Sequence, residues 1–430
     1  MPISADFERR LNAVLPRAAE HFGTPFHIYD EQEIEEKCAT FHRAFANTPY
    51  REYYAVKANP NPVVLRLLAA HGFGFDCSSL PELTAAVRAG AVGHDICFTS
   101  NNTSPAELDA AVRLGVLINV DDETALDKLA ARGEVPGTLC LRVHPGDAGR
   151  AAGASYLGDP QSAKFGIRAD RLPVVCARAR RMGVENFGLH MMLGSGYLTP
   201  QPFLLSLDLL LEHAETLHRD LGVLPGFLNL GGGIGIPYRP EEKPFDLLGL
   251  GAAVGARLRD WERGTGLPRP RLLFESGRYV TGPHGVLVTR VLNRMSKWRE
   301  YVGVDAGMSA LMRPAMYGAY HHITVPGGSG RRHEVVDVVG SLCENNDKFA
   351  QQRSLPTVTE GDLVVIHDTG AHAHSMGFTY NGRLRPQELL LRRGGSVERI
   401  RRAETEADYF ATLRCRPDVL APVTDPVGVR

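Results

Sequence analysis

Over its first 275 residues the chain alternates short apolar runs with longer amphipathic segments. The apolar runs lie at 26–29, 53–56, 73–76, 96–99, 116–120, 139–143, 187–191, 227–230 and 272–275. The segment 61–72 between two of them is typical of a helix: Asn61 can cap it, Pro62 suits its first turn, valines and leucines form a stripe, and Gly72 can end it. Further helices are expected at 80–90 and 202–222. Strand–helix alternation predicts a parallel sheet, and roughly eight repeats in about 250 residues favour a (β/α)8 barrel.

After residue 276 the pattern changes to strands separated by glycine- and proline-rich turns. Strand-like runs lie at 284–293, 319–325, 334–340 and 362–368, a helical signal returns only at 402–413, and 416–430 is proline-rich and expected to be irregular. We therefore predict a barrel domain over 27–275 and a mostly β domain over 276–430, with residues 1–26 packing on the latter.

Composition and charge narrow the class of protein. The 48 basic and 49 acidic residues leave a net charge of -1, which argues against a nucleic-acid partner. An uninterrupted apolar stretch long enough for a membrane span is absent from the sequence, and the charged N-terminus does not resemble a signal peptide. The seven cysteines are scattered without a C-x-x-C pair, as expected for free thiols in a reducing compartment. We expect a cytoplasmic protein without membrane partners.

Two features at the ends of apolar runs could carry chemistry. Lys57 follows the run 53–56, and a lysine at the C-terminal face of a barrel can form a Schiff base with an aldehyde, although a lysine past a strand can also simply extend into solvent. Gly231, Gly232 and Gly233 follow the run 227–230, where successive amides can cradle a phosphate or merely form a tight turn.

Other candidates lie further along the chain. Glu275 could hold a protonated pyridine nitrogen and Arg278 could clamp a carboxylate or phosphate, or the two could form an ion pair. Cys343 has acidic neighbours, which suits a neutral thiol that gives a proton or a buried cysteine. His372 and His374 have the alternation of one strand face. They lack a third ligand in a recognisable metal motif, so we expect no metal.

Taken together, the ordered motifs resemble the fold type III pyridoxal-phosphate decarboxylases, most closely the meso-diaminopimelate decarboxylase family. The likeness extends from residue 24 to about residue 391. It rests on the ordered series YYAVKANPN, GFGFDCSSLPEL, SAKFGI, GLHMMLGSG, LGGGIGI, ESGR, DAGMSALMRPAMYGAYH, GSLCENNDKFA and DTGAHAHSMGFTYNGRLRPQELL.

The resemblance implies pyridoxal 5′-phosphate as cofactor and a homodimer with shared active sites. Lys57 would be the Schiff-base lysine, and Cys343 of the partner subunit would protonate the carbanion after carbon dioxide leaves. The cofactor-binding residues would be Lys57, Asp76, His190, Ser195, Gly231, Gly232, Gly233, Glu275, Gly277, Arg278 and His372. The substrate-binding residues would be Arg278, Arg313, Tyr317, His372 and, from the partner, Glu344. The implied reaction is decarboxylation of meso-2,6-diaminopimelate to L-lysine.

Three positions depart from the pattern of the family. Met192 stands where relatives have a histidine against the cofactor ring, Ser276 where they have proline, and His372 where they have tyrosine. A histidine could keep a hydrogen bond there, with a charge that varies with pH. These departures leave open a decarboxylase of another amino acid or of a secondary-metabolite or siderophore precursor. A non-catalytic cofactor carrier and an amino-acid racemase are further alternatives, which the β domain and the Cys343–Glu344 pair disfavour.

Overall fold

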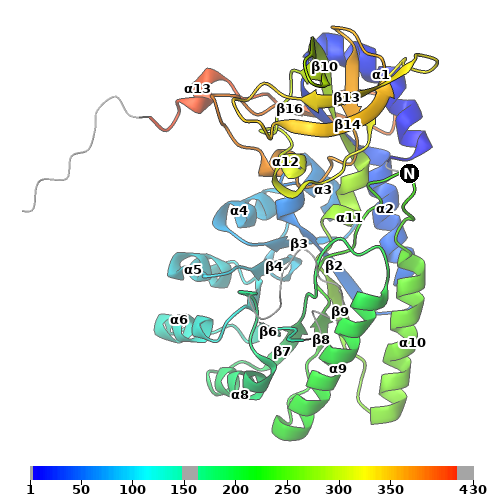
Figure 1. The fold of residues 1–430 in the computed structure, drawn as a ribbon. Coiled ribbons are helices and arrows are strands. Elements are labelled where there is room, and N and C mark those ends of the chain that lie inside the picture. Colours follow the sequence, from blue (N-terminus) through cyan, green and yellow to red (C-terminus); the bar gives the residue numbers. More distant parts are fainter. Residues whose placement is uncertain (1–2, 148–162, 414–430) are drawn as a thin grey trace, which may run out of the picture.

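A computed structural model describes residues 3–147 and 163–413 and contains a closed barrel beside a second sheet (Figure 1). Eight parallel strands pair in sequence order and the first closes on the last. They are β2 (Tyr50–Ala55), β3 (Gly74–Cys77), β4 (Ile96–Thr99), β5 (Leu117–Val120), β6 (Thr138–Arg142), β7 (Asn186–His190), β8 (Phe227–Asn229) and β9 (Arg271–Phe274). The predicted (β/α)8 barrel with an additional β-rich part is therefore confirmed.

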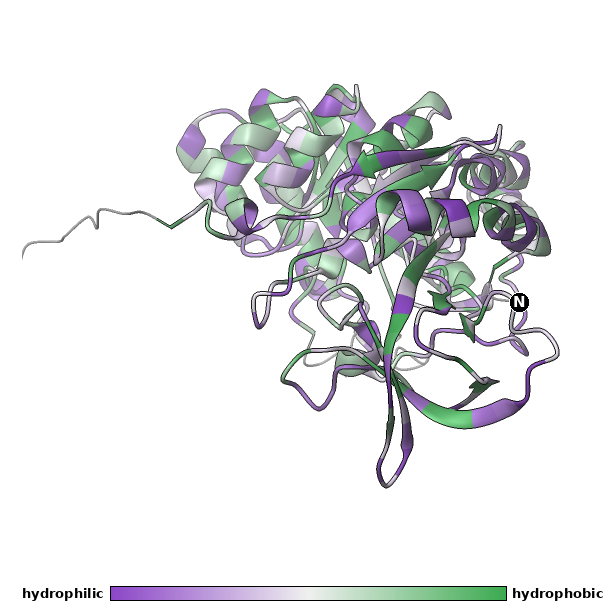
Figure 2. Ribbon diagram, turned by 90° about the horizontal axis from the view of Figure 1, so that it is seen from above, coloured by the Kyte–Doolittle hydropathy of each residue, from purple (hydrophilic) through white to green (hydrophobic). Residues whose placement is uncertain are grey.

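Amphipathic helices surround the barrel and bury their apolar faces against its strands. They are α2 (Glu31–Ala44), α3 (Pro62–Ala70), α4 (Leu80–Arg88), α5 (Pro105–Arg113), α6 (Thr124–Arg132), α8 (Leu172–Arg181), α9 (Gln201–Leu221) and α10 (Leu247–Thr265). The Asn61 side chain caps α3 by accepting from the N–H of Val63, and Pro62 occupies the first turn, as the sequence predicts. Figure 2 shows hydrophilic and hydrophobic residues alternating along these helices.

The second sheet is mixed and draws on both ends of the chain. Its main path runs β14-β13-β11-β10-β1-β16-β17, while β15 pairs with β10 and β12. The strands are β1 (Phe26–Asp30), β10 (Gly285–Ser296), β11 (Glu300–Val304), β12 (Ile323–Thr324), β13 (His333–Val339), β14 (Lys348–Pro356), β15 (Leu363–Ile366), β16 (Gln387–Leu391) and β17 (Val397–Arg401). Helix α1 (Ala5–Phe22) packs on β1 and β10 through Phe7, Leu11 and Leu15.

Several local expectations differ from the structure. The run at 26–29, which the alternation groups with the barrel strands, forms β1 instead and pairs antiparallel with β10 and parallel with β16. The run 319–325 contributes only the two-residue β12, and 402–413 only the short helix α13 (Glu406–Tyr409). Strands β11, β14, β16 and β17 are absent from the sequence interpretation. The segment 416–430 lies outside the described residues, and the domain boundaries at 27–275 and 276–430 remain a prediction.

The barrel strands position their C-terminal ends at one rim, and the short turns beyond them carry the polar residues of interest. Turn η1 (Val56–Ala58) follows β2, and the short helix α11 (Arg278–Thr281) follows β9. Helix α12 (Arg313–Tyr317) reaches this region from the second sheet. Within the described part of the chain, every helix is too short or too polar to cross a membrane.

Candidate active site

Lys57 and two buried carboxylates meet at the rim of the barrel. Lys57 lies in turn η1 directly after β2, and its Nζ is 3.6 Å from Oδ2 of Asp76 on β3. Glu275 follows β9 on the same rim. In the single chain 58% of the Lys57 side chain is exposed, whereas both carboxylates are buried. The amine therefore stands at the open mouth of the barrel, above an acidic floor.

The charges of this floor depend on one another. Removal from water by the surrounding barrel would lower the pKa of Lys57, although its side chain is partly exposed, but Asp76 and Glu275 raise that pKa above its usual value, so the free amine is protonated. Burial and the charge of Glu275 raise the pKa of Asp76. Burial opposes ionisation of Glu275 too, yet His190, Lys57 and Asn229 hold its pKa below the usual range. Glu275 thus remains an anion, as required of a group that holds a protonated pyridine nitrogen.

Asn229 fixes the direction of the Glu275 carboxylate. Its Nδ2 donates to Oε1 of Glu275 at 2.7 Å, and its Oδ1 accepts from the N–H of Gly231 at 2.9 Å. On the other side, Nε2 of His190 lies 3.5 Å from Oε2 of Glu275. Sequence reasoning missed Asn229, although a polar residue inside the apolar run 227–230 is a usable signal.

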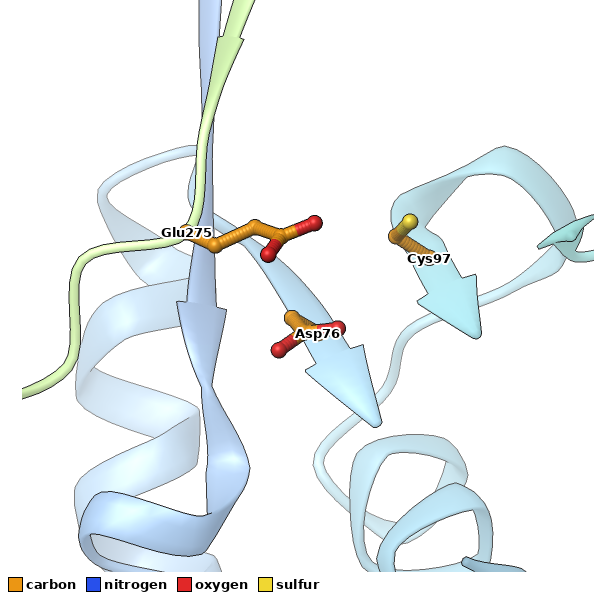
Figure 3. A group of neighbouring side chains, drawn as sticks. All are labelled: Asp76, Cys97 and Glu275. Atoms are coloured by element: carbon orange, nitrogen blue, oxygen red, sulfur yellow. The ribbon is translucent and has the colours of Figure 1, made fainter. Parts of the chain in front are cut away.

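Figure 3 shows Asp76 and Glu275 facing Cys97 inside the barrel, with ligand atoms of the three residues within 4.8 Å of one another. By composition this group could hold a metal ion. However, burial together with Glu275 and Asp76 raises the pKa of Cys97 well above its usual value. The sulfur is therefore a neutral thiol, whereas metals bind the thiolate. The contacts of Glu275 with Asn229 and His190 suit an organic cation better.

The glycines after β8 form a cradle into which no side chain fits. Gly231 and Gly233 have φ values of +65° and +101°, a region that favours glycine. A Cβ on Gly232 would lie 2.4 Å from the carbonyl oxygen of Glu275, and one on Gly233 would lie 2.3 Å from that of Gly194. The carbonyl of Gly233 accepts from the N–H of Gly196, next to Ser195. The glycine run and the segment around Ser195 thereby lie side by side, and backbone amides in such a place can hold an anion such as phosphate.

Two further residues border this cradle. A Cβ on Gly277 would lie 2.8 Å from that of Ala58, so glycine allows the start of α11 to approach the Lys57 turn. Met192 lies against Gly231 and thus in the wall of the site, consistent with a thioether packing on a ring.

Buried polar atoms without partners show that the site is built around something more. Nδ1 of His190 lacks a hydrogen bond, as do Oδ1 of Asp76 and Nε of Arg278. Buried polar groups are normally satisfied, so these atoms mark space for a polar ligand. An anionic floor, a lysine at the rim and a phosphate-sized cradle fit pyridoxal 5′-phosphate.

A cluster of positive charge lies beside the cradle. Nη1 of Arg278 donates to the phenol oxygen of Tyr238 at 2.5 Å, and Nη1 of Arg313 on α12 donates to the same oxygen. Sequence reasoning identified both arginines but missed Tyr238, which carries no signal beyond its place after the glycine run.

His372 lies near these arginines but not on a strand. It has a φ of +54°, its N–H donates to the carbonyl of Ala58 at 2.8 Å, and His374 begins the separate turn η6 (His374–Met376). Burial, then Arg278, Arg313 and Lys57, lower the pKa of His372 well below its usual value. The expected pH-dependent charge is thus corrected: the ring is neutral at physiological pH.

Ser276 follows Glu275 and contacts a buried acid. Its N–H donates to Oε1 of Glu52 at 2.5 Å, and burial raises the pKa of Glu52 well above its usual value. The backbone N–H at 276, which proline would lack, is therefore in use here.

Cys343, Glu344 and Tyr317 are not brought to the barrel floor. Among the described residues, neither Cys343 nor Glu344 has a hydrogen bond or ion pair with the barrel: the Cys343 N–H donates to Asn381, and Glu344 accepts from the N–H of Asn346. Both are exposed, as is Tyr317 at the end of α12. Asp347 anchors their loop by accepting from the N–H groups of Met308 and Leu342 at 2.6 and 2.8 Å.

Comparisons with known proteins agree with this geometry. A family model described as the pyridoxal-binding domain of pyridoxal-dependent decarboxylases matches residues 31–282. Protein TabA of Pseudomonas amygdali pv. tabaci is 46% identical over 424 residues, which are 98% of this chain and 99% of that protein. Diaminopimelate decarboxylase of Methanothermobacter thermautotrophicus is 38% identical over 91% of this chain and 92% of its own length.

Solved structures extend the likeness to three dimensions. The crystal structure of diaminopimelate decarboxylase from M. jannaschii in complex with L-lysine superposes with a TM-score of 0.84 at 30% identity, covering 93% of this chain and 94% of that one. With barrel, second sheet and site all in agreement, the chain belongs to the pyridoxal-dependent decarboxylase family and is a carboxy-lyase that uses pyridoxal 5′-phosphate.

Proposed function

We propose that the protein decarboxylates meso-2,6-diaminopimelate to L-lysine and carbon dioxide. The observation that carries this proposal is the pair of guanidinium groups of Arg278 and Arg313, which converge on Tyr238 beside the cofactor cradle. A substrate with a second amino-acid head group brings a carboxylate that such a pair can bind through several hydrogen bonds. The diaminopimelate decarboxylases among the relatives, and the L-lysine in the M. jannaschii complex, support the same substrate class.

The residues of the barrel have distinct roles in this proposal. Lys57 would hold the aldehyde carbon of the cofactor, Ser195 and the glycines 231–233 its phosphate, and Glu275 its pyridine nitrogen. Asp76 would stay beside the amine, and His190 with Met192 would line the ring. When bound, pyridoxal phosphate supplies an electron sink for the bond that releases carbon dioxide. The ionised Glu275 would keep the pyridine nitrogen protonated, which would strengthen that sink.

Completion of the site requires a second copy of the chain. Cys343 and Glu344 lie in an exposed loop that Asp347 anchors, without a bond to their own barrel among the described residues. In a homodimer with shared sites, this loop would reach the barrel of the other subunit. There the Cys343 thiol would donate its proton to the substrate carbon, and Glu344 would pair with the distal ammonium. Arg278, Arg313, Tyr317 and His372 would surround the distal carboxylate.

A panel of amino acids tests the substrate. Purified holoenzyme is incubated with meso-diaminopimelate, L-lysine, L-ornithine and L-arginine, and released carbon dioxide and product are measured. We expect turnover of diaminopimelate at least tenfold above any amino acid without a distal carboxylate, since a site built for a polar group discriminates strongly against its absence. Equal turnover of ornithine or lysine would refute the assignment, and racemised substrate without carbon dioxide would refute decarboxylation.

Mixed dimers test the shared site. Lys57→Ala and Cys343→Ala subunits are each expected to be nearly inactive, and their mixture should regain up to about a quarter of wild-type activity, because half of the dimers are mixed and each has one intact site. No recovery in dimers verified by differential tags would refute a shared site.

A second candidate is decarboxylation of another amino acid, including a precursor of a secondary metabolite or siderophore. One observation favours it: Met192 and His372 replace residues of the family pattern. It would retain the roles of Lys57 and Glu275, and the same substrate panel, extended to other dicarboxylic diamino acids, separates the two.

A further inference from the structure

Tyr238 stands between the two arginines that face the proposed substrate. It lies in the loop after the glycine run, Arg278 begins α11 after β9, and Arg313 begins α12 of the second sheet. Both guanidinium groups donate through Nη1 to the one phenol oxygen. Their Cζ atoms lie 5.8 and 4.8 Å from the centre of the Tyr238 ring. One side chain therefore contacts both cations through its oxygen and its ring.

The hydrogen-bonding capacity of a phenol explains what this arrangement can do. A tyrosine oxygen has two lone pairs and one proton. The two arginines use the lone pairs, so the O–H remains as a donor. Two guanidinium groups this close repel each other, and the shared acceptor together with the electron-rich ring compensates for that repulsion.

The surroundings of the ring keep it in place. The ring of His321 lies edge-on to that of Tyr238, with centroids 5.1 Å apart. His321 is fully buried and its Nδ1 is held at 2.8 Å from the carbonyl of His367. Burial, and then Arg313, lower the pKa of His321 to about 3, so this wall adds no third positive charge.

We infer that Tyr238 is the positioning residue of the distal-carboxylate subsite: it sets the spacing of Arg278 and Arg313 and directs its own O–H at the same carboxylate. The inference rests on the proposed function, because it concerns recognition of the second head group. Specificity for a substrate with a distal carboxylate then depends on Tyr238. This residue accepts hydrogen bonds from Arg278 of the barrel and from Arg313, which lies near the second sheet.

The test compares Tyr238→Phe with Tyr53→Phe. The first removes the oxygen and keeps the ring; the second removes a phenol oxygen that donates to the His94 carbonyl at the opposite end of the barrel. Hydrogen bonds to charged groups of this kind correspond to about a tenfold to hundredfold change in affinity. We therefore expect Tyr238→Phe to raise the KM for diaminopimelate by that factor with little change in kcat, and Tyr53→Phe to leave both unchanged.

Inhibition gives a readout that loss of folding would not mimic. L-lysine and cadaverine differ by one carboxylate, so inhibition by L-lysine should weaken about tenfold or more in Tyr238→Phe while inhibition by cadaverine stays constant. Equal weakening of both inhibitors, an unchanged KM, or loss of the absorbance of bound cofactor would overturn the inference.

The two proposals fail separately. If the wild type does not decarboxylate diaminopimelate, the proposed function falls. The role of Tyr238 is then tested on whichever amino acid the wild type decarboxylates. The measurement is the strength of inhibition by L-lysine relative to the strength of inhibition by cadaverine. A ratio that is the same in wild type and Tyr238→Phe overturns it.

Discussion

The hydrogen bond between Ser276 and Glu52 makes the position after Glu275 sensitive to proline. The resemblance to the family, whose pattern has proline here, implies that a proline ring is compatible with the backbone, but proline has no N–H to donate. In this chain the N–H of Ser276 is buried and donates to Oε1 of Glu52 at 2.5 Å, and Oε2 of Glu52 has no hydrogen bond. Ser276→Pro would therefore leave a fully buried carboxyl without a partner.

We expect Ser276→Pro to lower the free energy of unfolding by about 1–3 kcal/mol, which is the cost of leaving a buried polar group without a hydrogen bond. Ser276→Ala is the matched control, because it keeps the N–H that donates to Glu52 and removes only the side-chain hydroxyl. We expect Ser276→Ala to lower the free energy of unfolding by less than Ser276→Pro does, because it keeps the backbone hydrogen bond to Glu52. Urea denaturation of the holoenzyme measures the free energy of unfolding of both variants. The absorbance of bound cofactor shows whether a change next to Glu275 releases the cofactor.

Substitution of Glu52 checks the cause. In a Glu52→Leu background the acceptor is absent, so Ser276→Pro should lose most of its cost, with a coupling free energy of about 1 kcal/mol or more. The reasoning is refuted if Ser276→Pro is as stable as Ser276→Ala, or if its cost is unchanged in Glu52→Leu.

The same carboxyl predicts a dependence of stability on pH. Burial raises the pKa of Glu52 well above 4.5, so the folded protein retains a proton that the unfolded chain releases. The free energy by which the retained proton stabilises the folded state is fully present below the pKa of Glu52 in the unfolded chain. It is lost as the pH rises towards the pKa of Glu52 in the folded protein. Glu52→Gln, which keeps an acceptor for Ser276, should therefore gain stability relative to wild type between pH 5 and pH 8; a constant difference over that range would contradict the assignment.

Three further predictions concern the cradle, the neutral histidine and the cysteine loop. Gly232→Ala, whose Cβ would lie 2.4 Å from a carbonyl oxygen, should weaken cofactor binding about tenfold to hundredfold in an absorbance titration. The control Gly264→Ala, whose Cβ would have nothing within 4 Å, should leave cofactor binding unchanged. Equal effects of the two substitutions would refute the packing argument. His372→Tyr should leave the shape of the kcat/KM profile unchanged between pH 6 and pH 8, and disappearance of a titration near pH 6.5 would show that the ring is charged in wild type. Asp347→Asn should cost about 1–3 kcal/mol and lower kcat without loss of cofactor absorbance, and a kcat equal to wild type would contradict its anchoring role.

The sequence predicts the part of the site that local pattern encodes. Lys57 and Glu275 directly follow apolar barrel strands, and the strands of a barrel bring their C-terminal ends to one rim, so their proximity follows once the barrel is recognised. Tyr238 has no such signal, because its role depends on two arginines that lie 40 and 75 positions further along the chain. Cys343 illustrates a different limit, since in the proposed shared site its placement would depend on a second copy of the chain.

The fold shows the same division between local and distant information. Helix α3 is predictable because Asn61, Pro62 and the apolar stripe act within a few residues. Strand β1 is indistinguishable from a barrel strand by its composition, and only pairing with β10 and β16 assigns it to the second sheet. Such long-range pairing leaves no trace in the spacing of apolar residues.

The place of β1 in the second sheet has a consequence for synthesis of the protein. All five of its residues are buried between β10 and β16, yet β16 leaves the ribosome about 360 residues later. At 5–20 residues per second this delay is about 20–70 s. During that time the barrel can close and β10 can pair with one edge of β1, while the other edge of β1 remains without its partner. One edge of β1 is thus completed only when β16 has been made, and a chain stopped before residue 387 exposes that unpaired edge to chaperones and to other nascent chains.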